Sequence, residues 1–293
     1  MKPLKFVIPN GSLSQRLLMY LALAGYSLDK PDRRVFCGRS QDGRIEIIER
    51  DRRMIPHLVA RGYDAGITGL DLILNSRVEG LRTVANLCFA KRSDRPTRWV
   101  LAMQGMCDFT SKVRIGTELE NLPSILLPNC PLIIEDYEVV RLEGNEELAI
   151  EEDLCDLILV VTETGKTLDD LGLKIIPGCE QLLVSMPQII AKPELSPDKE
   201  EALQEIRFAL EAVIGGATRV MVKADLQKEA MKGLQLPSEI SPTVSPLARE
   251  GWIAVEICIP RTDIGPVGLK LERAGARGIV VQEVIAYATG KKK

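Results

Sequence analysis

The sequence predicts an α/β protein whose ligands bind at the carboxyl ends of parallel strands. Short apolar runs that read as strands alternate with runs that read as helices over most of the chain, which is typical of a parallel sheet. Two of the strand-like runs lead into turns rich in small and polar residues, in "VIPNGSLS" and "GITGLD". At 293 residues, the chain is long enough for two or three domains that each bury a core.

The first block begins with a strand over residues 4–9, which enters the turn around Gly11. Ser14 is suited to cap a helix over 15–24, which Gly25 ends. The next predicted elements are strands at 33–37 and 45–48, a helix at 55–61, a strand at 64–68 and a helix from Asp71. Residues 181–214, with a helix at 197–214, are expected to return to this block. The first domain therefore comprises 1–87 and 181–214.

Residues 88–180 form a second predicted domain, with strands at 99–103, 113–117, 133–140 and 157–161. We expect residues 215–217, Gly-Gly-Ala, to end the preceding helix and act as a hinge. The last block, 218–288, reads as a βαβ-like unit with strands at 219–223, 252–259 and 278–284, helices at 227–233 and 263–273, and a loop at 238–251. It is too short for a catalytic core of its own, so we interpret it as a regulatory or oligomerisation domain.

Composition excludes several function classes. A net charge of −3 argues against a general nucleic-acid surface. No apolar stretch reaches the roughly 18 residues of a membrane span, and the N-terminus lacks a signal-peptide core, so we expect a cytoplasmic protein. The seven cysteines contain no C-x-x-C pair and are predicted to be reduced and mostly buried. His57 is the sole histidine, which excludes the usual Ser-His and Cys-His triads and leaves positioning, carboxylates, backbone donors or a metal.

The stretch "VVTETGKTLDDLGL", residues 160–173, combines a strand, a polar loop and a helix start. It is not a Walker A loop, because position 160 is Val where that motif requires Gly. The geometry still suits an anion, since backbone N–H groups are exposed at a helix start. Thr164 and Thr167 would add hydroxyl donors, and Gly165 would allow close approach. An ordinary strand-to-helix turn is the alternative reading.

Several motifs in order resemble the long form of the ATP phosphoribosyltransferase family: "IPHLVARGYDAGITGLDLI", "IGTELENL", "LEGNEELA", "LCDLILVVTETGKTLDDLGL" and "SPTVSPLAREGWIAVEICIP". The resemblance implies a two-domain fold like that of periplasmic binding proteins, followed by a ferredoxin-like (α+β) regulatory domain. It also implies transfer of phosphoribose from phosphoribosyl pyrophosphate to N1 of ATP with Mg²⁺, the first step of histidine biosynthesis. A cytoplasmic homo-oligomer, a dimer or a hexamer, is expected.

The resemblance also implies roles for individual residues. The candidate catalytic residues are Asp156, Glu163 and Glu147. The candidate substrate-binding residues are Thr164, Gly165, Lys166 and Thr167 in the phosphate loop, and Asn10, Gly11, Ser12, Arg50, Arg52, Gly66, Thr68, Gly69 and Asp71 in the nucleotide cleft. Thr243 and Leu247 are the candidate contacts of a histidine effector. The alternatives are a helix cap for Asp71, a solvated helix start for Glu147, a charged loop for the arginines and a rigid diproline linker around Thr243.

The chain departs from the family pattern at positions close to the chemistry. Asn10 and Ser12 stand where the family has cations, Met54 where it has a carboxylate, and Val160 where it has a second aspartate of the phosphoribosyl strand. Arg50, Arg52 or Arg53 could replace a missing arginine, and Glu163 could reach the sugar. These departures leave two alternatives open: a paralogue with a different acceptor, or a binding or regulatory homologue with impaired catalysis.

Overall fold

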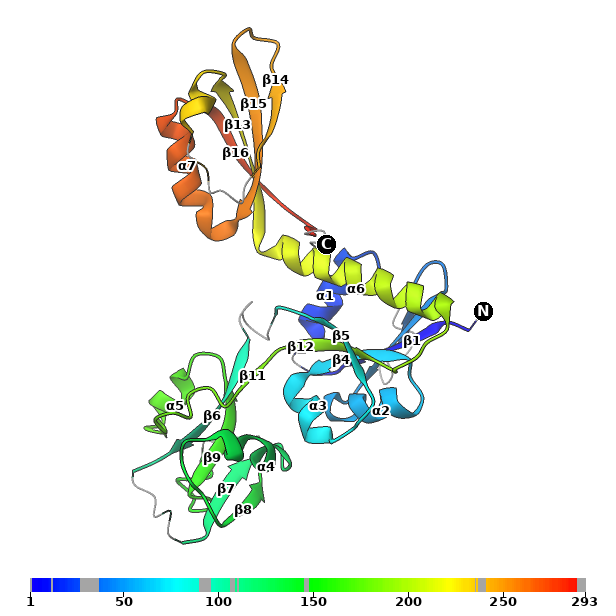
Figure 1. Cartoon of the computed structure of the whole chain (residues 1–293), viewed down its shortest axis with the longest axis vertical. Helices are drawn as coiled ribbons and strands as arrows, with labels where there is room; N and C mark the ends of the chain where they lie inside the picture. Colours follow the sequence, from blue (N-terminus) through cyan, green and yellow to red (C-terminus); the bar gives the residue numbers. More distant parts are fainter. Residues whose placement is uncertain are drawn as a thin grey trace. The chain divides into compact units, whose positions relative to one another are not determined.

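The computed structural model describes residues 2–11, 13–26, 37–89, 96–105, 109, 111–144, 148–234, 236 and 241–288. The chain divides into two compact units (Figure 1). The first unit comprises residues 1–22 and 26–207 and carries two mixed sheets; the second comprises 23–25 and 208–293 and carries one antiparallel sheet. The domain boundaries drawn from the sequence stay predictions. No helix in the described ranges is both long and apolar enough to cross a membrane.

The first sheet has the strand order β2-β3-β1-β4-β12-β5. Its strands are β1 (Leu4–Pro9), β2 (Cys37–Arg39), β3 (Ile45–Arg50), β4 (Ala65–Gly69), β5 (Arg82–Asn86) and β12 (Pro187–Ala191). β1 runs parallel to β3 and β4, and it is buried along nearly its whole length, as expected of a central parallel strand. The helix α1 (Ser14–Leu23) covers one face, and α2 (Ile55–Arg61) and α3 (Leu70–Ser76) cover the other (Figure 1).

The second sheet has the order β10-β6-β9-β7-β8, and β11 also pairs with β6. Its strands are β6 (Thr97–Met103), β7 (Val113–Thr117), β8 (Tyr137–Arg141), β9 (Leu157–Thr162), β10 (Lys174–Ile175) and β11 (Leu183–Ser185). Its helices are α4 (Leu122–Leu126) and α5 (Lys166–Asp170), with a 3₁₀ turn at Leu127–Asn129. The strand predicted from residue 133 begins only at Tyr137, because Leu132 and Ile134 pack against the core without joining the ladder.

Each sheet of the first unit holds an antiparallel strand beside its parallel strands. β6 pairs antiparallel with β9 in the second sheet, and β12 pairs antiparallel with β4 and β5 in the first. The chain enters the second sheet through β6 and re-enters the first through β12, so two crossings join the two lobes. This arrangement confirms the predicted two-domain fold of the periplasmic-binding-protein type.

The core of the second lobe lies on both faces of its sheet. Along β9, Leu157 and Leu159 pack into one apolar cluster, whereas Ile158 and Val160 pack into the other. This alternation is the side-chain period of a strand that is buried on both faces. Cys155 belongs to the second cluster, where burial raises the pKa of its thiol to about 11, in keeping with the predicted packing role.

The second unit is a four-stranded antiparallel sheet with the order β14-β15-β13-β16. Its elements are β13 (Arg219–Gln227), a 3₁₀ turn at Ala230–Gly233, β14 (Thr243–Pro246), β15 (Trp252–Pro260), a 3₁₀ turn at Arg261–Asp263, α7 (Ile264–Arg273) and β16 (Arg277–Glu283). Numbered by their order in this unit, the strands are arranged 4-1-3-2, as in the expected ferredoxin-like domain. The helix predicted at 227–233 is replaced by the end of β13 and the first 3₁₀ turn.

The helix α6 (Pro197–Ala217) runs through the glycines that we expected to form a hinge. A Cβ atom on Gly215 would lie 2.4 Å from the carbonyl oxygen of Tyr287, and one on Gly216 would lie 2.5 Å from that of Ile285. The N–H of Tyr287 donates to the carbonyl of Ala212 over 2.7 Å. The helix ends at Ala217, within the predicted residues 215–217, and the hinge stays a prediction. The two glycines allow residues 285–287 to approach the helix backbone.

Candidate functional site

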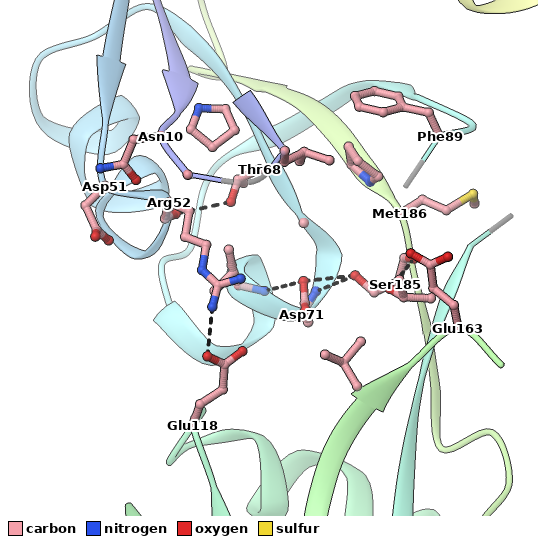
Figure 2. Close-up of a pocket in the computed structure, with 18 of the residues that line it drawn as sticks. Asn10, Asp51, Arg52, Thr68, Asp71, Phe89, Glu118, Glu163, Ser185 and Met186 are labelled. Carbon is pink, nitrogen blue, oxygen red and sulfur yellow. Dashed lines mark hydrogen bonds and ion pairs between the residues drawn. The ribbon is translucent and has the colours of Figure 1, made fainter. Parts of the chain in front are cut away.

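A pocket of about 540 Å³ lies in the first unit, where strand ends from both sheets meet (Figure 2). The first lobe contributes the segment after β1, the end of β4, the start of α3 and the start of β12. The second lobe contributes the start of β6, the segment after β7 and the end of β9. The lining residues used below are Asn10, Gly11, Asp51, Arg52, Thr68, Gly69, Asp71, Glu118, Val161, Thr162, Glu163 and Ser185.

The turn after β1 brings backbone and an amide side chain to the pocket. The N–H of Asn10 donates to the carbonyl of Arg50 over 2.8 Å, which continues the ladder between β1 and β3 by one residue. Gly11 has φ +86°, a left-handed conformation that glycine adopts without strain, and the chain turns here into α1. Asn10 and Gly11 thus line the pocket as predicted, whereas Ser12 lies outside the described residues.

Arg52 is the one Lys, Arg or His side chain among the described residues that line this pocket, and it is held from the opposite lobe. Its guanidinium donates to Oε2 of Glu118 over 2.7 Å (Figure 2). Arg53 donates to the same oxygen over 3.1 Å. Asp51 caps the 3₁₀ turn Arg52–Met54 by accepting from the N–H of Arg53. The prediction for Arg50 is wrong as regards this pocket, since Arg50 donates to the carbonyl of Glu49 and does not line it.

Asp71 lies in the first turn of α3 and connects the two lobes. Its Oδ1 accepts from the hydroxyl of Ser185 over 2.9 Å and from the N–H of Leu72 over 3.0 Å, and its Oδ2 accepts from Nε1 of Trp99 over 3.1 Å. Trp99 is fully buried, so its N–H requires a partner within the protein. Asp71 is therefore more than a helix cap: three donors position this carboxylate at the pocket wall (Figure 2).

The "GITG" segment divides into residues that face the pocket and one that does not. Thr68 and Gly69 line it, and Thr68 is almost fully buried, with its hydroxyl 3.4 Å from the carbonyl of Arg52. Gly66 is a packing residue, because a Cβ there would lie 2.5 Å from Cγ1 and 2.7 Å from the carbonyl oxygen of Val7. The prediction that Gly66 binds substrate is corrected accordingly: it lets β4 approach β1.

The loop after β9 turns sharply into α5. Gly165 has φ +83° and precedes the helix, its N–H donates to the hydroxyl of Thr162 over 2.8 Å, and the N–H of Lys166 lies 3.4 Å from the hydroxyl of Thr164. Of this segment, Thr162 and Glu163 line the pocket, whereas residues 164–167 do not. The hydroxyls of Thr162 and Thr164 thus accept from the backbone N–H groups of Gly165 and Lys166. We expected such N–H groups to bind an anion.

Arg98, at the start of β6, lies beside this loop and was missed from the sequence. Its Nη2 is 3.6 Å from the position that a Cβ on Gly165 would take, and its Nη1 donates to the carbonyl of Glu180 over 3.2 Å. The signal in the sequence was a lone cation that opens the apolar run "TRWVLAM". Glu118 and Ser185 were missed as well, because their contacts are made across the lobes.

Asp156 lies at the opposite end of β9 from the pocket. The strand of six residues separates it from Glu163 by about 20 Å. Asp156 accepts from the backbone N–H and the guanidinium of Arg114, each over 2.8 Å, and hydrogen bonding from that side chain lowers the pKa of its carboxyl. Arg114 is thus the partner of this carboxylate, and its catalytic assignment is corrected to a structural ion pair.

Val160 also faces away from the pocket. Its side chain is 5% exposed and lies in the apolar cluster with Val100 and Leu168, whereas its neighbour Val161 lines the pocket. The structure thus contradicts the expectation that the side chain at position 160 lies close to the reacting groups. Glu147 lies outside the described residues.

Four carboxylates and one guanidinium line the pocket: Asp51, Asp71, Glu118, Glu163 and Arg52. Among the described residues, no group of three or more His, Cys, Asp or Glu side chains is arranged to hold a metal ion. Asp51, Asp71 and Glu118 already accept hydrogen bonds from the protein. The lining thus offers separate carboxylates, and one or two of these are enough to bind an ion carried by the phosphates of a ligand.

The fold and the pocket define a two-lobed α/β ligand-binding protein with its site at the strand ends of both lobes. Comparison with known proteins identifies the family. The model of the family described as "ATP phosphoribosyltransferase" matches residues 51–212, and that described as "HisG, C-terminal domain" matches residues 217–285. The chain belongs to the ATP phosphoribosyltransferase family, in its long form.

Individual relatives agree with this assignment over nearly the whole chain. An ATP phosphoribosyltransferase of Chlorobaculum parvum is 30% identical over 291 residues, 96% of either chain. One of Nitratidesulfovibrio vulgaris is 30% identical over 290 residues, 95% of this chain and 96% of the relative. A chain of the solved ATP phosphoribosyl transferase (HisG:HisZ) complex from Thermotoga maritima shares the fold with a TM-score of 0.59, at 24% identity, over 71% of this chain and 96% of that chain.

Proposed function

We propose that this protein transfers the phosphoribosyl group of phosphoribosyl pyrophosphate to N1 of the adenine of ATP, the first step of histidine biosynthesis. The proposal is supported by membership of the family over both of its matched regions. The observation that carries it is the convergence on one pocket of the turn after β1, the "GITG" turn and the segment after β9. These are the three segments that the resemblance assigns to the two substrates.

Each proposed role follows from the position of the residue. Thr164 and Lys166 would bind the sugar 5-phosphate by exchanging their internal bond for bonds to the anion, and Thr167 would add its hydroxyl. Arg98 would add a positive charge beside the loop. Glu163, at the pocket edge of the same loop, is placed to accept from the ribose hydroxyls. Arg52, from the other lobe, would take the departing pyrophosphate.

In the proposed reaction, the bond from C1 to the pyrophosphate oxygen breaks and its electron pair leaves with the pyrophosphate. The lone pair of adenine N1 forms the new bond to C1. Because the transition state resembles an oxocarbenium ion, the chain contributes mainly by holding the two substrates in line in the pocket and by placing carboxylates near the sugar. Mg²⁺, bound through the substrate phosphates, would supply positive charge to the leaving group.

The charge of the pocket supports a second candidate, an acceptor with less negative charge than ATP. The described lining holds four carboxylates and only Arg52 as a cation, and Asn10 stands where the family carries a lysine. A pocket lined mainly by carboxylates attracts the negatively charged triphosphate of ATP only weakly. Under this candidate, the phosphoribosyl side of the site stays the same and only the acceptor differs.

The proposal also covers regulation, assembly and location. Thr243 lies in the edge strand β14, which is exposed along its length, and Leu247 donates its N–H to the carbonyl of Trp252. Histidine would bind near these two residues and inhibit the enzyme, which we propose to be a cytoplasmic homo-oligomer. The segment that the sequence offered as a linker or a loop thus contains a sheet edge, where pairing between chains is possible.

Product formation tests the proposed reaction directly. The purified chain is incubated with phosphoribosyl pyrophosphate, Mg²⁺ and either ATP or other purine acceptors, and the adducts are identified by mass spectrometry. We expect phosphoribosyl-ATP, and we expect Thr167→Val to raise the KM for phosphoribosyl pyrophosphate, whereas Thr262→Val, at an exposed site of the second unit, leaves it unchanged. Adducts with another acceptor but none with ATP would establish the second candidate, and no adduct with any acceptor would refute both.

A further inference from the structure

A second cavity, of about 560 Å³, adjoins the first and shares two of its carboxylates, those of Asp51 and Glu118. It is lined from the first lobe by residues of the 3₁₀ turn, α2 and α3, and from the second lobe by the segment after β7 and the end of β8. Its lining includes Arg53, His57, Asn75, Glu120, Asn121 and Arg141. The proposed reaction uses none of these six.

Hydrogen-bond donors line this cavity, among them the side chains of Arg53, His57, Asn75 and Arg141. Arg53 directs one guanidinium nitrogen to Glu118 and has further N–H groups on its fork. Arg141, at the end of β8, has one ion pair within the described part of the chain, a long 3.5 Å contact with the exposed Glu143. Asn75 accepts from the N–H of Asn121 through Oδ1, which makes its amide nitrogen the group that can donate to a ligand. The imidazole of His57 completes the set.

The carboxylates of the cavity are placed differently. Asp51 accepts from the backbone N–H of Arg53, and Glu118 accepts from both Arg52 and Arg53. Glu120, the third carboxylate, is exposed to solvent. Two guanidinium forks, an imidazole and an amide therefore surround a cavity in which two of the three carboxylates are already bonded. Guanidinium forks match planar and tetrahedral oxyanions, to which they donate in pairs.

We propose that the second cavity binds a compact oxyanion with about two negative charges, a phosphate or a dicarboxylate, through Arg53, His57, Asn75 and Arg141. Such a ligand would also affect the first pocket, an effect that rests on the proposed function. It draws Arg53 away from Glu118, so that this carboxylate interacts with Arg52 alone. Arg52 is then less available to a pyrophosphate group in the first pocket, and the ligand raises the KM for phosphoribosyl pyrophosphate.

His57 is the sole histidine of the chain and lines this cavity, so its NMR resonance reports on binding there. The Cε1–H resonance of His57 is unique in a spectrum of histidine-labelled protein. Inorganic phosphate and malonate are titrated in separate arms into the full chain, at fixed pH and with sodium chloride keeping the ionic strength constant. We expect a saturable shift of this resonance in at least one arm. The arm that saturates at lower concentration identifies the phosphate or the carboxylate source.

Variants distinguish anion binding in this cavity from binding in the first pocket and from a general effect of protein charge. Arg141→Gln removes one fork and should weaken binding about tenfold, the loss expected for hydrogen bonds to a charged group. Arg141→Lys, which keeps the charge, should weaken it less. Arg39→Gln is the matched control, because Arg39 is an exposed strand arginine that pairs with Glu46 and lines neither cavity. Thr167→Val, in the phosphate loop, should leave the His57 shift unchanged.

A shift that stays linear in both arms, or one that saturates equally in Arg141→Gln and in the unaltered chain, would overturn the site. Loss of the shift in Thr167→Val would place the anion in the phosphate loop and would also overturn it. The spectrum does not depend on turnover, so a chain without phosphoribosyltransferase activity can still show the site. A saturable His57 shift with no change in KM would refute only the link through Glu118.

Discussion

The contact between Asp71 and Trp99 ties α3 of the first lobe to β6 of the second, and two substitutions test how much it contributes. Asp71→Asn keeps the size of the side chain but offers one acceptor oxygen in place of two. In the observed geometry, Oδ1 accepts from Ser185 and Leu72, so the amide oxygen of the variant stays there and its NH₂ faces Nε1 of Trp99. The fully buried indole N–H then meets a donor instead of an acceptor.

The expected cost follows from this change. A hydrogen bond to a charged group contributes about 1.5–3 kcal/mol, and a buried donor left without a partner costs about 1–3 kcal/mol. We expect Asp71→Asn to lower the free energy of unfolding of the first unit by about 2–3 kcal/mol. Trp99→Phe removes the N–H itself, so in that background Asp71→Asn should cost less, by about 1–2 kcal/mol.

Urea unfolding followed by far-UV circular dichroism measures the four corners of this double-mutant cycle. Trp252→Phe is the control, because Trp252 lies in the second unit and stacks on Arg249 and Arg277 rather than on the Asp71 network. Its effect should add to that of Asp71→Asn within about 0.5 kcal/mol. Equal costs for Asp71→Asn with and without the Trp99 indole N–H would refute the reasoning. A folded Asp71→Asn variant that loses turnover would assign the carboxylate a further role at the substrate.

Three further predictions concern single residues. Arg98→Gln should raise the KM for phosphoribosyl pyrophosphate about tenfold in steady-state assays while thermal stability stays within about 0.5 kcal/mol; an unchanged KM would separate Arg98 from the phosphate. Gly66→Ala should cost about 1–3 kcal/mol in thermal denaturation because its Cβ meets Val7, whereas Gly62→Ala, with open space around it, should change stability little; equal effects would contradict the packing role. Asp156→Asn should destabilise the protein at neutral pH. The hydrogen bond from Arg114 lowers the pKa of this carboxyl, so its stabilisation is present above the unfolded pKa of about 3.9 and is lost as pH falls through the lower folded value. Unfolding measured over a pH series should show the difference shrinking in acid, and a difference that is constant with pH would contradict the ion pair.

Local sequence patterns predicted those helices and strands whose burial can be recognised from their own residues. The run Leu4–Pro9 is apolar on both faces because it is a central parallel strand, and β1 has those bounds. The edge strand at residue 243 was not predicted, and a loop was expected over 238–251 instead, for the opposite reason. β14 is exposed throughout and contains Pro246, so neither burial nor alternation marks it, and only its pairing with β15 makes it a strand.

The sequence predicted the site residues that lie in turns of small and polar residues at the ends of strands. Asn10 and Gly11 follow β1, Thr68 and Gly69 end β4, and all four line the pocket. The catalytic prediction for Asp156 was wrong because the sequence shows a carboxylate next to a buried strand but does not show which end of that strand faces the pocket. Only the sheet, with β9 parallel to β7, shows which end faces the pocket and which one meets Arg114.

The placement of Arg52 shows how the departures from the family pattern can be offset. The resemblance places the missing arginine of the family at position 51, where this chain has an aspartate that caps the next turn, and Arg52 stands one residue later. Because Glu118 comes from the other lobe, a pyrophosphate that binds Arg52 must compete with an ion pair between the lobes. Under the proposed role of Arg52, substrate charge and the lobe contact that Arg52 shares with Arg53 at Glu118 are therefore coupled. Removing the competitor by Glu118→Gln should favour the polyanionic substrate over the contact between the lobes, whereas removing Arg52 should weaken both.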